Sequence, residues 1–107
     1  MYPESLFIVR VSDSEVSCES PEGTIEKIQW DEIDKIEIVT TSDGPFLPDV
    51  FWVLIGTEKQ CVVPSGATGE KQLLTRLQAL PGFHNEVLIS AMSCTADRHF
   101  TCWIRVK

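Results

Sequence analysis

Short runs of alternating apolar and polar residues fill the first half of the chain. In residues 35–41, Ile36, Ile38 and Thr40 fall on one side of an extended chain, and the intervening residues fall on the other. The same period predicts strands over residues 6–11, 15–19 and 24–30, and residues 31–34 predict a single tight turn. Consecutive short strands of this kind indicate an antiparallel meander with one buried and one solvated face.

The run of residues 50–55 differs from the others because it has no polar position. A continuous apolar run of this length predicts a central strand that is covered on both faces. A turn at residues 56–59 leads into a further strand at residues 60–64. Since the second face of the central strand needs a cover, we expect the back half of the chain to supply it.

Helical spacing replaces alternation after residue 69. Leucines recur at three- and four-residue intervals from residue 70 to residue 80, with Thr68 as the expected N-cap. Pro81 and Gly82 end this helix. Asn85 is expected to cap a second short helix, whose apolar stripe comprises Leu88, Ala91, Met92 and Thr95.

The last run, residues 99–106, alternates again and predicts a final strand at an edge of the sheet. Strict alternation places Phe100, Cys102 and Ile104 on one face of this strand. The opposite face, which we expect to be the outer one, carries His99, Thr101, Trp103 and Arg105. Exposed aromatic side chains are enriched at interfaces. Trp103 is therefore a candidate contact residue, the alternative being that it covers the sheet beneath a helix.

Together these elements predict an α+β fold. We expect a bent, mostly antiparallel sheet or partly open barrel of six to seven strands, with two helices from the C-terminal half over one face or open end. A length of 107 residues suits a single globular domain over residues 1–107. The chain has no run of about 18 apolar residues and starts without a signal-peptide pattern, so we predict a cytoplasmic protein.

Charge is large and unevenly distributed. The net charge is −7, and residues 1–50 alone carry twelve acidic and three basic residues. An acidic surface repels phosphate backbones and anionic lipid heads, so we expect neither nucleic acid nor membrane as a partner. Net charge of this kind keeps a small domain in solution. The sharper interpretation is an acidic face that steers a protein partner with a basic surface.

The cysteines form no metal or catalytic motif. Cys18, Cys61, Cys94 and Cys102 contain no C-x-x-C pair, whereas structural zinc sites usually draw their ligands in close pairs. His99 and Cys102 fall on opposite faces of the last strand, which makes them poor ligands for one ion. The glycine-rich segment 64–69 lacks the Lys-Ser/Thr of a phosphate-binding loop. We therefore expect no metal, no cofactor and no catalytic residues.

The loop at residues 42–49 is stiffened by Pro45 and Pro48, which restrict both their own backbone and that of the preceding residues. Two interpretations stay open: the loop folds back as a lid on the core, or it forms a preorganised binding tip. The candidate interaction residues are Asp43, Phe46, Leu47 and Asp49 in this loop, with His99 and Trp103 on the last strand.

The strand meander resembles that of pleckstrin-homology-like domains: Trp30-x-x-Ile33 is followed by a stiff loop, an apolar strand, a hairpin and a helix. Unlike that pattern, which ends in one long helix and has a basic loop cluster for phosphoinositides, this chain continues with two helices and a strand and lacks the cluster. The chain is also similar, over about its last three quarters, to small bacterial proteins known only as conserved hypothetical proteins. This likeness implies no functional residues, and it lies in Asp43-Gly44-Pro45-Phe46, Asp49-Val50-Phe51-Trp52, Pro64-Ser65-Gly66-Ala67 and Leu80-Pro81-Gly82-Phe83.

The sequence therefore favours a non-catalytic binding or protein-interaction module. The alternative is a small-ligand or enzymatic role in a cavity between sheet and helices, lined by Trp30 or Trp52 with convergent polar groups. The chain is expected to be a monomer or a homodimer that forms through an edge strand.

Overall fold

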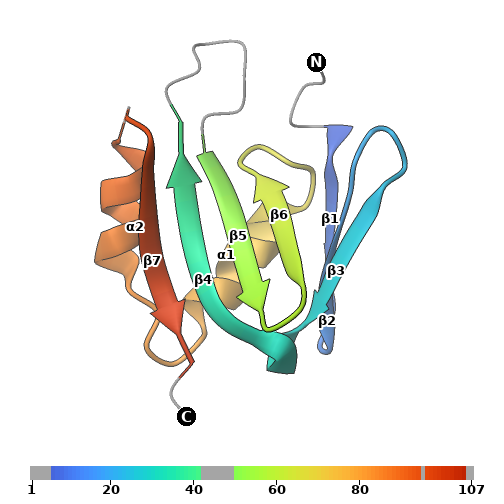
Figure 1. The fold of residues 1–107 in the computed structure, drawn as a ribbon, viewed down its shortest axis with the longest axis horizontal. Helices are drawn as coiled ribbons and strands as arrows, with labels where there is room; N and C mark the ends of the chain where they lie inside the picture. Colours follow the sequence, from blue (N-terminus) through green and yellow to red (C-terminus); the bar gives the residue numbers. More distant parts are fainter. Residues whose placement is uncertain (1–5, 42–49, 95, 106–107) are drawn as a thin grey trace.

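The computed structural model describes residues 6–41, 50–94 and 96–105. These residues form seven strands in two antiparallel sheets and two helices, and the sheets do not close into a barrel (Figure 1). The predicted α+β fold, with its strand number and its two helices in the C-terminal half, is confirmed. One sheet has the order β1-β2-β3 and comprises β1 (Ile8–Val11), β2 (Glu15–Glu19) and β3 (Ile25–Gln29). The other has the order β6-β5-β4-β7 and comprises β4 (Ile33–Thr40), β5 (Val50–Gly56), β6 (Gln60–Pro64) and β7 (Arg98–Ile104). The helices are α1 (Glu70–Gln78) and α2 (Asn85–Met92).

Alternation places the strands as the sequence predicts in the front half. In β2, Val16 and Cys18 are buried, and Val16 pairs with the buried Ile28 of β3. In β4, Ile36, Ile38 and Thr40 are likewise buried and the residues between them are half-buried. The predicted turn before β4 is a single 3₁₀ turn at Trp30–Glu32, in which the Glu32 carboxylate accepts a hydrogen bond from the Gln29 backbone N–H.

The core is formed by residues of both sheets and both helices. Trp52 and Leu54 of β5 are buried against Leu73 and Leu77 of α1, all at 1% exposure or less. The Trp52 Nε1–H donates to the Glu70 carboxylate over 2.8 Å, so the first residue of α1 satisfies the only polar group of this buried indole. Because Trp52 is packed, it does not line an accessible cavity between sheet and helices.

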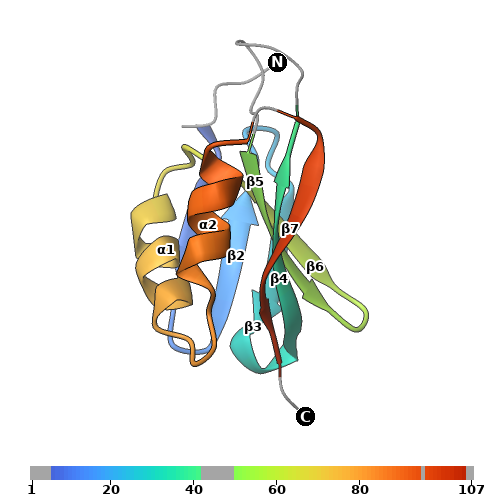
Figure 2. The same ribbon diagram turned by 90° about the vertical axis from the view of Figure 1, so that its left-hand side faces the viewer.

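The helices cover only one face of the four-stranded sheet (Figure 2). The prediction that residues 50–55 are covered on both faces is therefore wrong for the described residues, although the back half does supply the cover of one face. Trp52 and Leu54 face the helices, whereas Phe51, Val53 and Ile55 are half-buried on the opposite face. A run with no polar residue predicts burial, but it does not say what provides the cover.

The start of α1 is built differently from the prediction. Thr68 does not cap the helix, because its backbone is bonded to β1: Thr68 N–H donates to Phe7 O over 2.9 Å, and Val9 N–H donates to Thr68 O over 2.8 Å. The N-cap is Gly69, with a φ of 92°, a conformation that glycine adopts without steric cost. Thr68 and Gly69 therefore join α1 to the edge of the three-stranded sheet. Similarly, His84 and not Asn85 is the N-cap of α2.

Arg105, the residue after β7, is hydrogen-bonded to the junction between the two sheets. Its Nε–H donates to Ile33 O and its Nη2 donates to Trp30 O, each over 2.8 Å, and its backbone N–H donates to Asp34 O over 2.8 Å. The guanidinium also lies over the Trp103 ring, 5.2 Å from its centroid. One side chain thus satisfies two carbonyl groups at the bend from β3 to β4.

Candidate functional site

A β-bulge in β7 changes the face on which Trp103 lies. Ile36 pairs with Trp103, but the next residue of β4, Glu37, pairs with Thr101, so Cys102 is an extra residue. Cys102 and Trp103 are consequently both buried, and Ile104 is 62% exposed. Strict alternation fails at the bulge, and the predicted outer-face position of Trp103 is wrong.

Trp103 is part of the core and not a surface anchor. Its side chain packs beneath the connection between the helices, and its Nε1–H donates to Pro81 O over 2.9 Å. At 7% exposure it has little surface to offer a partner. The alternative interpretation, a tryptophan buried against the sheet, therefore holds.

His99 lies where the sequence predicts, on the exposed outer side of β7. Its Nδ1 is 3.6 Å from the Glu37 carboxylate of β4, which also contacts Lys35 Nζ at 3.3 Å. The remaining candidates, Asp43, Phe46, Leu47 and Asp49, lie outside the described residues. The two interpretations of their loop, a lid on the core and a binding tip, therefore both stay predictions.

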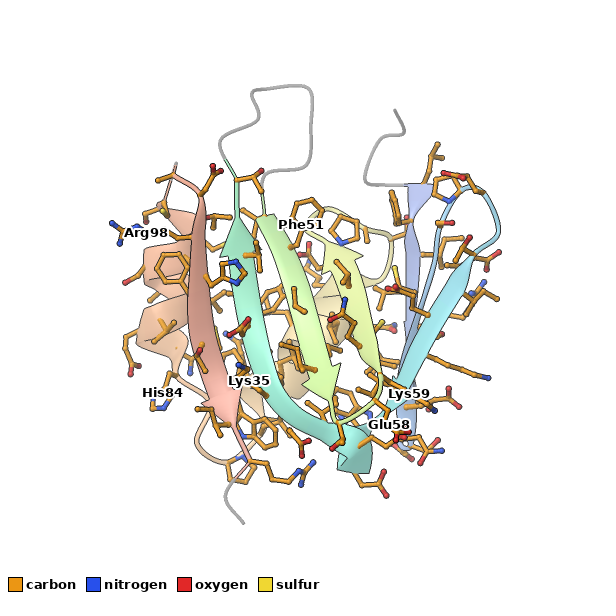
Figure 3. The ribbon with its side chains drawn as sticks, viewed as in Figure 1. Lys35, Phe51, Glu58, Lys59, His84 and Arg98 are labelled. Atoms are coloured by element: carbon orange, nitrogen blue, oxygen red, sulfur yellow. The ribbon has the colours of Figure 1, made fainter. Side chains whose placement is uncertain are left out.

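The face of the four-stranded sheet that points away from the helices is apolar along β5 and partly polar on the other strands, and we call it the open sheet face. Figure 3 is viewed toward this side, with Phe51 near one end of β5 and Lys35 near the other end of β4. Paired neighbours on three strands supply its centre: Val53 of β5 pairs with Val62 of β6, and Phe51 pairs with Val39 of β4. These side chains are half-buried. The apolar residues of the face are Val39, Phe51, Val53, Ile55, Val62 and the exposed Ile104, and its polar residues on β4 and β7 are Lys35, Glu37, His99 and Thr101.

A small pocket of about 230 Å³ continues the open sheet face toward the three-stranded sheet. It shares Phe51 and Val62 with that face and reaches Cys18 of β2. At its edge the Val62 N–H donates to the Glu26 carboxylate over 2.9 Å. β3 and β6 lie near each other here but are not paired by backbone hydrogen bonds. The Glu26 carboxylate therefore accepts the bond that a backbone carbonyl would accept in a paired strand.

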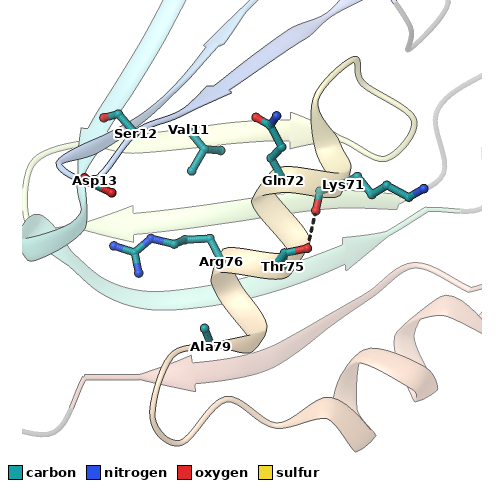
Figure 4. A pocket seen from close by; sticks show the side chains of 8 residues that line it. All are labelled: Val11, Ser12, Asp13, Lys71, Gln72, Thr75, Arg76 and Ala79. Atoms are coloured by element: carbon teal, nitrogen blue, oxygen red, sulfur yellow. Dashed lines mark hydrogen bonds between the residues drawn. The ribbon is translucent and has the colours of Figure 1, made fainter.

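A second, larger groove lies on the helix side of the molecule (Figure 4). It has a volume of about 630 Å³ and runs between α1 and the turn that joins β1 to β2. Arg76 projects from α1 into this groove, and its guanidinium lies over the Trp30 ring, 4.8 Å from the centroid. Sequence reasoning missed this groove because its walls are about 60 residues apart in the chain and share no periodic pattern.

The part of the chain that the structure describes contains no assembled metal site. No group of three or more His, Cys, Asp or Glu side chains there lies close enough to hold a metal ion. The imidazole Nδ1 of His84 lies 3.2 Å from the carboxylate of the exposed Glu86. Within the same residues, no helix is long and apolar enough to cross a bilayer.

The connection between the two helices occupies part of the β7 edge. The His84 N–H donates to Cys102 O over 2.9 Å, so the connection between the helices uses one acceptor of this edge strand. A homodimer that adds a strand at β7 would have to displace that bond. The oligomeric state stays a prediction.

All four cysteines are free thiols, and three of them are buried. Burial raises the pKa of Cys18 and Cys102 from 9.0 to about 11. Burial, with the neighbouring Cys18 and Glu26 as smaller causes, raises the pKa of Cys61 to about 12. A buried thiol of this kind stays protonated and unreactive at neutral pH.

We expect the free energy of unfolding to fall as the pH rises from about 9 toward 11. In that window the unfolded chain has released the thiol protons of Cys18, Cys61 and Cys102, whereas the folded chain still holds them. The stabilisation is fully present below pH 9 and is lost as the pH passes the raised values. Urea unfolding at a series of pH values measures it, and Cys102→Ala should have a shallower slope than the parent chain. Equal slopes would contradict this assignment.

Comparisons of the chain with protein-family models, with curated protein sequences and with solved structures gave no match. The resemblances to pleckstrin-homology-like domains and to small bacterial proteins therefore stay predictions. Function has to be inferred from the surfaces described above.

Proposed function

We propose that this protein is a non-catalytic interaction module that binds a protein partner through the open sheet face. The observation that carries this proposal is β5: it has no polar residue, and the described helices cover only one of its faces. The free face of an antiparallel sheet is normally polar. A contiguous apolar patch on a surface marks an interaction site.

The composition of the open sheet face suits a protein partner. Its apolar part is formed by branched and aromatic side chains on neighbouring strands. Ionisable groups border this part on the β4 and β7 side, where Lys35 pairs with Ile55, Glu37 with Val53 and His99 with Val39. An apolar centre with a polar rim is the usual anatomy of a protein–protein interface. Burial of this patch would contribute roughly 25 cal/mol for each Å² of apolar surface.

Charge favours a partner with basic groups around an apolar centre. The chain carries a net charge of −7, and acidic side chains stand near the open sheet face at Glu26 and Glu58. Such a field speeds association with a positively charged partner, and salt weakens the effect. Association is accordingly expected to slow as ionic strength rises.

A pair of matched substitutions tests this function. Val53→Lys places a positive charge at the centre of the open sheet face, whereas Ile89→Lys makes the same kind of change at a 67% exposed position on α2. Partners are captured from cell extract by a photo-crosslinking residue at position 55, identified by mass spectrometry and prepared in pure form. We expect Val53→Lys to weaken binding of the pure partner at least tenfold, about 1.4 kcal/mol, and Ile89→Lys to leave it unchanged.

Circular dichroism and urea unfolding establish that both variants are folded. Val53→Thr, which keeps the branched shape, should weaken binding less than Val53→Lys. Binding that is the same for Val53→Lys and the parent chain would rule out the open sheet face as the contact. Light scattering separates self-association from binding to another protein, since the proposal expects a monomer in isolation.

A further inference from the structure

The groove between α1 and the β1–β2 turn holds one cationic wall and one anionic wall. Asp13 stands on the turn, and Arg76 extends toward that turn from α1 (Figure 4). Val11 and Ala79 contribute apolar surface to the lining of the groove. At about 630 Å³, the groove falls within the range of small-molecule sites.

Arg76 is held in place by an aromatic ring and not by an acid. Its guanidinium lies over Trp30, and the indole is itself fixed because Trp30 Nε1–H donates to Ser12 O over 2.8 Å. Arg76 forms no ion pair with any described residue. Stacking uses the face of a guanidinium and leaves the N–H groups at its edge available for a planar acceptor such as a carboxylate.

Asp13 is the complementary group. It is exposed at the tip of the turn, where Ser12 and Ser14 make the local hydrogen bonds. Within the described residues, Asp13 has neither an ion pair nor a hydrogen bond of its own. A carboxylate that faces a stacked arginine across a groove, without pairing with it, leaves room for a ligand between the two charges.

We propose that this groove binds a small zwitterionic ligand, an amino acid or short peptide with a free ammonium and a free carboxylate. The ligand carboxylate accepts hydrogen bonds from the edge of the Arg76 guanidinium, and the ligand ammonium pairs with Asp13. The intervening atoms lie near Val11, with the side-chain amide of Gln72 within the same lining. This site is separate from the open sheet face, so either proposal can fail without the other.

Charge explains why a zwitterion fits better than a simple anion. The chain has a net charge of −7, and Asp13 adds a negative charge on the facing wall, so an anion at Arg76 is repelled both at long range and locally. The second cation of the lining, Lys71, points away from Arg76 (Figure 4) and does not form a two-cation clamp with it. A ligand without net charge avoids the repulsion and pairs both groups.

The test follows the indole N–H signal of Trp30 by ¹⁵N NMR during titration with glycine, 4-aminobutyrate and triglycine, which differ in the distance between their charges. Trp30 is an informative reporter because it contacts Arg76 through its ring and Ser12 through its N–H. We expect a saturable shift by about 20 mM for at least one of the three, as suits a ligand of few atoms. The preferred length then measures the spacing of the two charges.

Three variants separate specific binding from a general charge effect. Asp13→Asn and Arg76→Gln should each weaken the binding at least tenfold, whereas Lys71→Gln, which removes a cation from the same helix and the same groove, should leave it unchanged. Asp13 is exposed on a turn, so its substitution is compatible with folding. The absence of a saturable shift with all three ligands would overturn the proposal. So would equal binding by the parent chain and Asp13→Asn, or an equal shift from acetate alone.

Discussion

Gly69→Ala is expected to lower the free energy of unfolding by about 3–5 kcal/mol, because two costs combine at this position. The residue has a φ of +92°, where a side chain is strained, and an added Cβ would overlap the carbonyl oxygen of Val9. That oxygen belongs to β1, which the neighbouring Thr68 ties to α1 through two backbone hydrogen bonds. Relief of the overlap requires the strand and the helix to separate.

Gly23→Ala is the matched control for this substitution. Gly23 also has a φ of +92°, but an added Cβ there would meet no atom within 4 Å. It should cost only the backbone strain, about 1–2 kcal/mol. Urea unfolding followed by tryptophan fluorescence compares the two. Equal losses would show that contact with β1 is unimportant.

Arg105→Met is expected to lower the free energy of unfolding by about 2–4 kcal/mol, since charged hydrogen bonds to two carbonyls are lost together. The Ile33 and Trp30 carbonyls lose their donors, and the Trp103 ring loses the guanidinium above it. Methionine keeps much of the side-chain length and so limits the loss of packing. Arg105→Lys should recover only part of the stability, because an ammonium group lacks the planar fork of donors.

Arg98→Met tests whether the effect belongs to this site or to charge alone. Arg98 is at the opposite end of β7 and is exposed, so its replacement should change stability by no more than about 0.5 kcal/mol. Thermal and urea unfolding of the three variants gives the comparison. A loss for Arg98→Met as large as that for Arg105→Met would contradict the specific role of Arg105.

Most of the strands could be predicted from alternation, because one buried face imposes a period of two on the sequence. The pattern fails at Cys102, where a single inserted residue reverses the faces of Trp103 and Ile104. Nothing in the local sequence marks that bulge, since both interpretations place an apolar residue in the core. The face on which Trp103 lies is therefore set by how β7 pairs with β4 and not by the sequence of β7 alone.

The candidate surfaces were predicted less well than the fold. The lack of polar residues in residues 50–55 predicted cover on both faces of β5, but the described residues cover only one of them. The groove beside Arg76 depends on contacts between Trp30 and α1, and no period in a sequence encodes such a meeting of distant segments. The net charge indicated only that a partner with a basic surface is favoured.

The carboxylate of Glu26 at the gap between β3 and β6 has a consequence for aggregation. An edge strand with free N–H groups invites a strand from another molecule. At Val62 the donor that such a strand would use is already bonded to Glu26. The same carboxylate brings a negative charge to the edge, where an identical molecule would bring a second one. The Glu26 carboxylate therefore discourages edge-to-edge association of identical molecules into fibrils, even though β6 has no paired strand on this side.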